Sequence, residues 1–161
     1  MEGLLPKLHG SDAVEIPGAR ALLDDLIAAE APWAIVTSGT VPLVTGWLDV
    51  LKLPHPEILV SAESVENGKP DPACYNLGRE KLGLARDGGS EILVLEDSPA
   101  SIKSGKAAGC KVLGLVTSHT VEQVVAAGPD WVVRDLRSVK MIGREGKGVT
   151  LQISDAFVPS A

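Results

Sequence analysis

Short apolar runs alternate along this chain with longer segments in which apolar residues recur at helical spacing, and this alternation limits the possible folds more than any other feature. The apolar runs predict strands at residues 33–36, 57–60, 91–95, 112–116 and 131–133. The periodic segments predict helices at residues 17–30, 41–53, 72–84, 99–109 and 121–127. Strands that are joined through helices run parallel within one sheet. We therefore predict an α/β fold with a doubly wound, Rossmann-like parallel sheet.

Net charge and cysteine content limit which classes of partner and which cellular compartment are expected for this chain. The formal net charge is −6, whereas nucleic acid and anionic membranes bind proteins through a concentrated basic face. Two cysteines, Cys74 and Cys110, are too few for a disulfide framework and lack the spacing of a zinc site. No run of about 18 apolar residues is present that would span a membrane. We expect a cytoplasmic protein without nucleic-acid or membrane partners; the sequence does not indicate its oligomeric state.

A polar cluster follows the strand predicted at residues 33–36. The hydroxyls of Thr37 and Ser38 and the backbone N–H groups around Gly39 stand at the start of the next predicted helix. A helix N-terminus carries partial positive charge, so these groups are candidates for binding a phosphate. The same residues are also typical of an ordinary helix N-cap.

A lysine in a restricted loop is the second candidate. Lys69 lies between Gly68 and Pro70, and the proline restricts the backbone, so its ammonium group can be directed at a fixed point. A phosphate dianion needs such a charge. The alternative is a solvated lysine in a turn, with Asp71 capping the next helix.

Two adjacent carboxylates follow the apolar run at residues 91–95. Glu96 and Asp97 are expected at the water-facing end of a buried strand, and carboxylate oxygens suit Mg²⁺. Alternatively, Asp97 or Ser98 caps the helix that begins near Pro99. His119 also follows a predicted strand and is open to two interpretations, a substrate contact or an exposed loop histidine.

The ordered set of hydroxyl, lysine and acid pair resembles the haloacid dehalogenase (HAD) superfamily. The runs VTSGT, NGKPDP, LEDSPASIKSGKAAGCKVLGL and DWVVRDLRSVK are similar to the fungal glycerol-3-phosphate and 2-deoxyglucose-6-phosphate phosphatases. The resemblance implies a Mg²⁺-dependent phosphatase, a phosphoric monoester hydrolase, whose partner is a small sugar or polyol phosphate. It implies that Thr37 and Ser38 hold the phosphoryl group, that Lys69 neutralises it, and that Glu96 and Asp97 bind Mg²⁺.

The sequence departs from the family at its first motif, an apolar strand ending in Asp-x-Asp-Gly-Thr whose first Asp attacks phosphorus. No two aspartates in this chain are two positions apart. In the family this strand lies between the strand before Thr37 and the strand before Glu96, and a helical cap follows it. We therefore expect a HAD core, at residues 14–142, that lacks its first, central strand and the cap. Residues 1–13 would be a remnant of cap or linker, and residues 143–161 a tail with one strand.

Two smaller expectations follow from these departures. Without the central strand, the remaining strands either leave backbone groups unpaired or close against one another. Ser101 and Ser104 stand where the family usually has Gly or Ala, which puts close packing of the helix at residues 99–109 in question.

Two functions are open at this point. The first is a phosphatase that is inactive without the strand bearing the nucleophile. The second is a non-catalytic phosphate- and metal-binding or regulatory domain derived from such an enzyme. The sequence does not identify the substrate.

Overall fold

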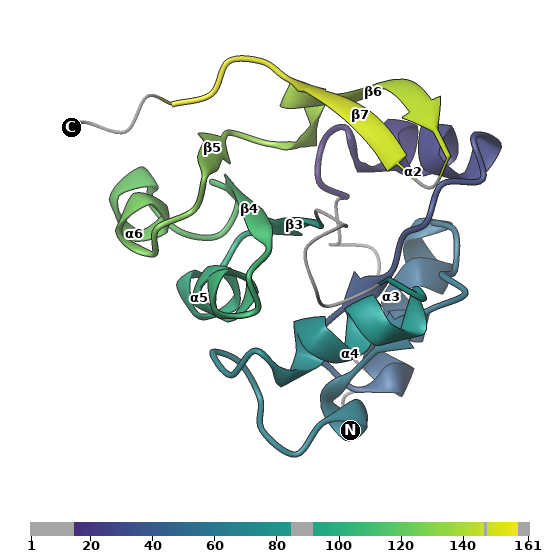
Figure 1. Cartoon of the computed structure of the whole chain (residues 1–161), viewed down its shortest axis with the longest axis vertical. Helices are drawn as coiled ribbons and strands as arrows, with labels where there is room; N and C mark the ends of the chain where they lie inside the picture. The colour runs from purple at the N-terminus through teal and green to yellow at the C-terminus, as the bar shows by residue number, and fades with distance from the viewer. Residues whose placement is uncertain (1–14, 85–91, 147, 158–161) are drawn as a thin grey trace.

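The computed structural model describes residues 15–84, 92–146 and 148–157, in which helices and strands alternate as in an α/β fold (Figure 1). The parallel strands are β1 (Ile35–Val36), β2 (Leu59–Val60), β3 (Leu93–Glu96), β4 (Lys111–Leu115) and β5 (Trp131–Val133). The helices are α2 (Ala19–Ala28), α3 (Val41–Leu51), α4 (Ala73–Lys81), α5 (Pro99–Ala107) and α6 (Val121–Ala126). Each lies at the position that the sequence predicted, so the expected fold class is confirmed.

The parallel strands form two separate sheets. β1 pairs with β2, and β3, β4 and β5 form a second sheet in that order. Within the described residues, no backbone pairing joins β1 to β3. Of the two outcomes expected for a core without its central strand, the structure adopts the one in which the strands stay apart.

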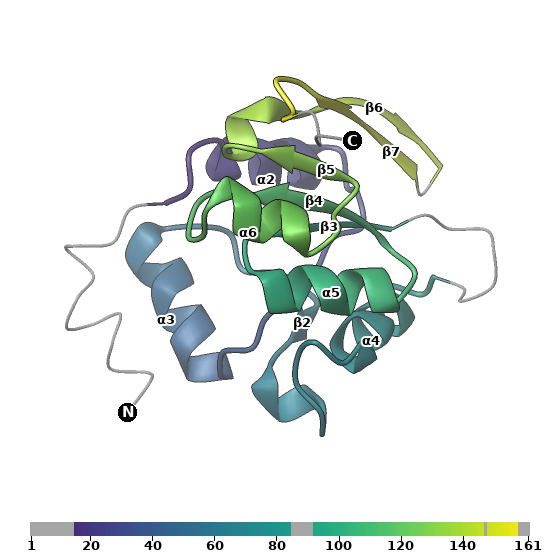
Figure 2. The ribbon, with the colours of Figure 1, turned by 90° about the vertical axis from the view of Figure 1, so that its left-hand side faces the viewer.

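The three-stranded sheet is buried on both faces, which explains its apolar sequence. Alternate residues point to opposite faces. One face packs with α5 and α6, and the other with α2 and a C-terminal hairpin (Figure 2). The first cluster includes Val94, Val112, Ile102, Val124 and Val132, and the second includes Leu22, Leu113, Leu115, Val133 and Val139.

A helix layer connects the two sheets. α4 packs on β1 and β2, α5 packs on β3 and β4, and the two helices contact one another. Ser104 on α5 is fully buried, and its hydroxyl donates to the Asp71 carbonyl at 2.6 Å and lies 3.4 Å from Cys74 Sγ. The sequence put close packing of α5 in question, because Ser104 stands in place of Gly or Ala. In the structure, Ser104 forms a polar contact between α5 and the loop before α4.

Side-chain caps start three of the helices. The hydroxyls of Thr40, Ser98 and Thr120 accept backbone N–H groups at the starts of α3, α5 and α6. Ser98, not Asp97, caps α5, so the carboxylate of Asp97 is left for other contacts. Asp71 accepts the N–H of Ala73 at 2.9 Å, as the capping interpretation expected.

The C-terminal segment forms an antiparallel hairpin of β6 (Val139–Glu145) and β7 (Gly148–Ile153). One strand was expected in residues 143–161, and β7 occupies that position. The structure adds a second strand, which begins before residue 143 and packs against α2. The predicted cap or linker remnant at residues 1–13 lies outside the described residues. Among the described helices, none has the length and apolar character needed to cross a membrane.

We predict that Gly114→Ala destabilises the three-stranded sheet. A Cβ at this buried position in β4 would lie 2.5 Å from Val124 Cγ1 and 3.3 Å from Pro129 Cγ. Overpacking of this kind lowers the free energy of unfolding by about 1–3 kcal/mol. Urea unfolding should show a lower midpoint with an unchanged m-value.

Gly143→Ala is the matched control, because its Cβ would lie 3.5 Å from Thr150 Cβ, an ordinary contact. We expect its free energy of unfolding to stay within about 0.5 kcal/mol of the parent. Equal effects of the two substitutions would contradict the steric explanation.

Candidate phosphate site

A buried ion pair lies at the carboxyl ends of β1 and β3. The Lys69 ammonium is 2.7 Å from Glu96 Oε1 and 3.3 Å from the carbonyl oxygen of Val36. The side chains of Lys69 and Glu96 are only 6% and 12% exposed. Lys69 therefore connects the last residue of β1 to the last residue of β3, and the interpretation of a solvated turn lysine is wrong.

Tyr75 on α4 holds both partners of this pair in place. Its hydroxyl donates to Glu96 Oε1 at 2.6 Å, and the Lys69 ammonium lies 5.0 Å from the centre of its ring. Burial, reinforced by the Glu96 carboxylate, raises the pKa of the Tyr75 hydroxyl far above its ordinary range. Tyr75 therefore remains a hydrogen-bond donor to Glu96.

The loop after β1 places two hydroxyls at the same edge. Thr37 continues the pairing with β2 through its N–H, which donates to the Val60 carbonyl at 2.9 Å. Its Oγ1 accepts the N–H of Gly39 at 3.0 Å, so this N–H is engaged within the loop. Ser38 is exposed. Thr40 caps α3. The hydroxyls of Thr37 and Ser38 are therefore not needed as the N-cap of this helix.

A carboxylate contacts the start of α3. Glu63 Oε1 accepts the N–H of Val41 at 3.3 Å, and Glu63 Oε2 accepts the Ser61 hydroxyl at 2.7 Å. The Ser61 hydrogen bond is the main cause that lowers the pKa of the Glu63 carboxyl. The N-terminus of α3 therefore already has an anion beside it, as its partial positive charge favours.

The acid pair divides between two roles. Glu96 accepts Lys69 and Tyr75 at Oε1 and the N–H of Asp97 at Oε2, 3.2 Å away. Asp97 Oδ2 accepts the Ser118 hydroxyl at 2.8 Å. Glu96 mainly positions Lys69, whereas Asp97 extends toward the loop after β4.

The described residues supply only part of a metal coordination shell. Within residues 15–84, 92–146 and 148–157, no three His, Cys, Asp or Glu side chains gather closely enough to hold a metal ion. Glu96 and Asp97 fit Mg²⁺ in the chemistry of their oxygens, and one or two carboxylates are the usual protein contribution to its six oxygen ligands, the others being waters and substrate oxygens.

Sequence reasoning did not find Tyr75 or Ser118. Ser118 carries a usable signal, since it is a polar residue in the loop after a predicted strand, like Thr37. Tyr75 carries none, because its role depends on the tertiary packing that brings its hydroxyl to Glu96.

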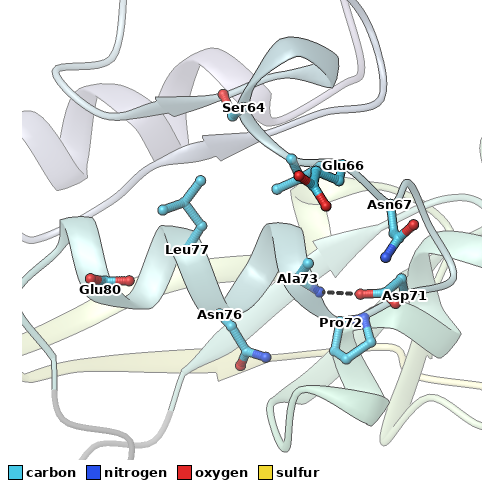
Figure 3. A pocket seen from close by; sticks show the side chains of 10 residues that line it. Ser64, Glu66, Asn67, Asp71, Pro72, Ala73, Asn76, Leu77 and Glu80 are labelled. Atoms are coloured by element: carbon cyan, nitrogen blue, oxygen red, sulfur yellow. Dashed lines mark hydrogen bonds between the residues drawn. The ribbon is translucent and has the colours of Figure 1, made fainter.

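An open depression lies beside this site without including it. Figure 3 shows its lining from the loop before α4 and from α4 itself, with Glu66, Asn67 and Asn76 among the polar groups. The sequence-predicted residues of the site do not line it.

The family resemblance is confirmed by comparison with known proteins. A family model described as haloacid dehalogenase-like hydrolase matches residues 6–115. The chain is 37% identical over 146 residues to glycerol-1-phosphate phosphohydrolase 1 of Saccharomyces cerevisiae, covering 88% of this chain and 58% of that protein. It is 49% identical over 100 residues to hexitol phosphatase A of Escherichia coli, covering 62% of this chain and 45% of that protein. The chain thus spans about half the length of these relatives.

A solved structure shares the fold over most of this chain. A hydrolase from Pseudomonas syringae superposes with a TM-score of 0.73 at 27% identity, covering 83% of this chain and 61% of that one.

We predict a strong energetic coupling between Lys69 and Glu96. Lys69→Met and Glu96→Gln each leave a buried partner without its counter-charge, and breaking a buried pair costs roughly 3–5 kcal/mol. The double variant removes both charges and should recover part of the loss. A double-mutant cycle on urea unfolding should give an interaction energy of about 0.5–3 kcal/mol, and additive losses would contradict the pairing.

Proposed function

The chain belongs to the haloacid dehalogenase-like hydrolases, and we propose on this basis that it forms the phosphate-binding part of a phosphatase for small sugar or polyol phosphates. The activities for which two relatives are named, a glycerol-1-phosphate phosphohydrolase and a hexitol phosphatase, support this substrate class. The observation that carries the proposal is the buried Lys69 ammonium at the carboxyl edge of the sheets. Ligands of open α/β sheets bind at this edge.

Lys69 supplies the charge that a phosphoryl group needs. An ammonium has three N–H donors, and two of them are used by Glu96 and the Val36 carbonyl. No other group among the described residues accepts the third donor, which would serve a phosphoryl oxygen. The hydroxyls of Thr37 and Ser38 at the same edge would accompany it, because both follow β1 directly. Phosphoryl transfer depends mainly on such positioning and charge neutralisation.

Asp97 and Glu96 would hold Mg²⁺ together with ligands from outside the described residues. When bound, the ion would neutralise charge on the phosphoryl oxygens. Asp97 is the better ligand of the two, because Glu96 already accepts three hydrogen bonds.

The nucleophile would come from a strand inserted between β1 and β3. Ile35 and Thr37 donate their N–H groups to β2, so the backbone groups of Val36 point away from β2. On the other side, the Ile92 carbonyl accepts the N–H of Lys111, so the backbone groups of Ile92 face β4. Because the direction alternates along a strand, the backbone groups of Leu93 and Leu95 point away from β4. Because Lys69 touches the ends of both β1 and β3, an inserted strand would end beside its ammonium.

The chemistry requires a carboxylate at the end of that strand. A carboxylate oxygen would attack phosphorus while the ester P–O bond breaks, and a second carboxyl would protonate the leaving alkoxide. Water would then hydrolyse the acyl phosphate to carboxylate and inorganic phosphate. No Asp-x-Asp occurs in this sequence, so the strand is another segment.

One observation favours a second candidate function, a non-catalytic phosphate-binding domain. The sequence contains Lys69 and the acid pair but no Asp-x-Asp. The two candidates differ in turnover and not in phosphate binding. For either one we propose a cytoplasmic location, which agrees with the two buried free thiols of Cys74 and Cys110.

We predict that the chain binds inorganic phosphate and that it hydrolyses glycerol phosphate only when a strand is supplied. Calorimetry would measure phosphate binding, and phosphate release with Mg²⁺ would measure turnover. The added peptide would be an apolar strand ending in Asp-x-Asp-Gly-Thr. The matched control is the same peptide with its first Asp replaced by Asn, which should dock equally but give no turnover.

The outcomes separate the two candidates. Turnover with the Asp peptide alone supports the phosphatase. Phosphate binding without turnover, although the peptide docks, supports the non-catalytic domain. Failure to bind phosphate would overturn both.

A further inference from the structure

A three-residue hydrogen-bonded chain runs from the acid pair to the loop after β4. The Ser118 hydroxyl donates to Asp97 Oδ2 at 2.8 Å, and Ser118 Oγ also lies 2.9 Å from His119 Nδ1. Asp97 follows β3, and Ser118 and His119 follow β4, which pairs with β3 in parallel. All three therefore lie at the carboxyl edge that carries the candidate phosphate site.

Counting protons along this chain identifies Nδ1 as a hydrogen-bond donor of the imidazole. A hydroxyl has one proton to donate, and Ser118 gives it to the Asp97 carboxylate. The remaining contact of Ser118 Oγ can only be as an acceptor, so His119 Nδ1 must carry a proton. A neutral imidazole then has a lone pair at Nε2.

The position of His119 suits the organic part of a substrate better than its phosphate. Thr37 and Ser38 follow β1 on one side of the acid pair, whereas His119 follows β4 on the other. His119 is half-buried, so its ring is held at the surface without being covered. A bare Nε2 accepts a hydrogen bond from a hydroxyl group but offers no donor to a phosphate oxygen.

We propose that His119 recognises a hydroxyl group of the sugar or polyol phosphate through Nε2, and that Ser118 is the positioning residue that sets its tautomer. This inference rests on the proposed function and adds a specificity-determining residue to it. Of the two sequence interpretations of His119, the proposal adopts the substrate contact. An exposed loop histidine would have no fixed protonated nitrogen.

We predict that the tautomer is set in the free chain. Long-range ¹H–¹⁵N NMR of the full chain should show the His119 proton on Nδ1. Ser118→Ala removes the oxygen that accepts from His119 Nδ1. The ¹⁵N signals of the His119 ring should then shift toward the tautomer mixture of a solvent-exposed histidine. A proton on Nε2 in the parent chain would overturn the proposal directly.

Binding experiments then test recognition with two substitutions at one position. In His119→Asn, the amide nitrogen can still donate to Ser118, but no atom reaches the position of Nε2. In His119→Gln, the longer side chain can place an acceptor oxygen there. We expect His119→Asn to weaken glycerol phosphate binding by about 3- to 10-fold, the effect of one hydrogen bond, and His119→Gln to recover most of it.

Inorganic phosphate is the internal control, because it has the charge of the substrate but no polyol hydroxyl. Its affinity should be equal in the parent chain and both variants. Normal phosphate binding with unchanged affinity for glycerol phosphate in His119→Asn would overturn this inference alone. If the parent chain itself does not bind inorganic phosphate, the proposed function is overturned, and this inference with it.

Discussion

One buried charge pair, Lys69 with Glu96, joins two sheets between which the described residues form no backbone pairing. Removing two charges from water is costly, and their attraction compensates only when further hydrogen bonds satisfy them. Those bonds are present: Tyr75 donates to Glu96, and the Val36 carbonyl accepts from Lys69. The pair is therefore both a connection between sheets and the centre of the candidate site. Its geometry sets how far β1 lies from β3 at this edge.

The helix layer carries the rest of the connection. Arg79 near the end of α4 is 9% exposed and donates to the Ala108 carbonyl at 3.0 Å, just past the end of α5. A cation is favourable there, because the C-terminus of a helix carries partial negative charge. Arg79 Nε has no partner among the described residues, so the contact is incompletely satisfied. Together with Ser104, this packing connects the helix on β1 and β2 to the helix on β3 and β4.

Local sequence patterns were sufficient to predict the elements and to suggest candidate site residues. Each parallel strand is a short apolar run, and the polar residues at the ends of these runs drew attention to Thr37, Glu96 and Asp97. Glu96, however, is buried in its ion pair with Lys69 and is not water-facing as the sequence suggested. The break between the sheets was predicted only as one of two outcomes. The choice depended on the α4–α5 contacts, which join residues far apart in sequence. Tyr75 was missed for the same reason, because only tertiary packing brings it to Glu96.

The same constraint would link folding to phosphate binding in the proposed function. Lys69 must stay desolvated to hold the sheets together, and a desolvated ammonium with a free donor attracts an anion strongly. Glu96 limits that attraction, since it already neutralises the charge. In the proposed function, a phosphate would meet a partly neutralised lysine, and a metal ion held beside Asp97 would supply additional positive charge. The need for Mg²⁺ in the proposed reaction would then follow from the structural role of Glu96 as much as from the chemistry of phosphoryl transfer.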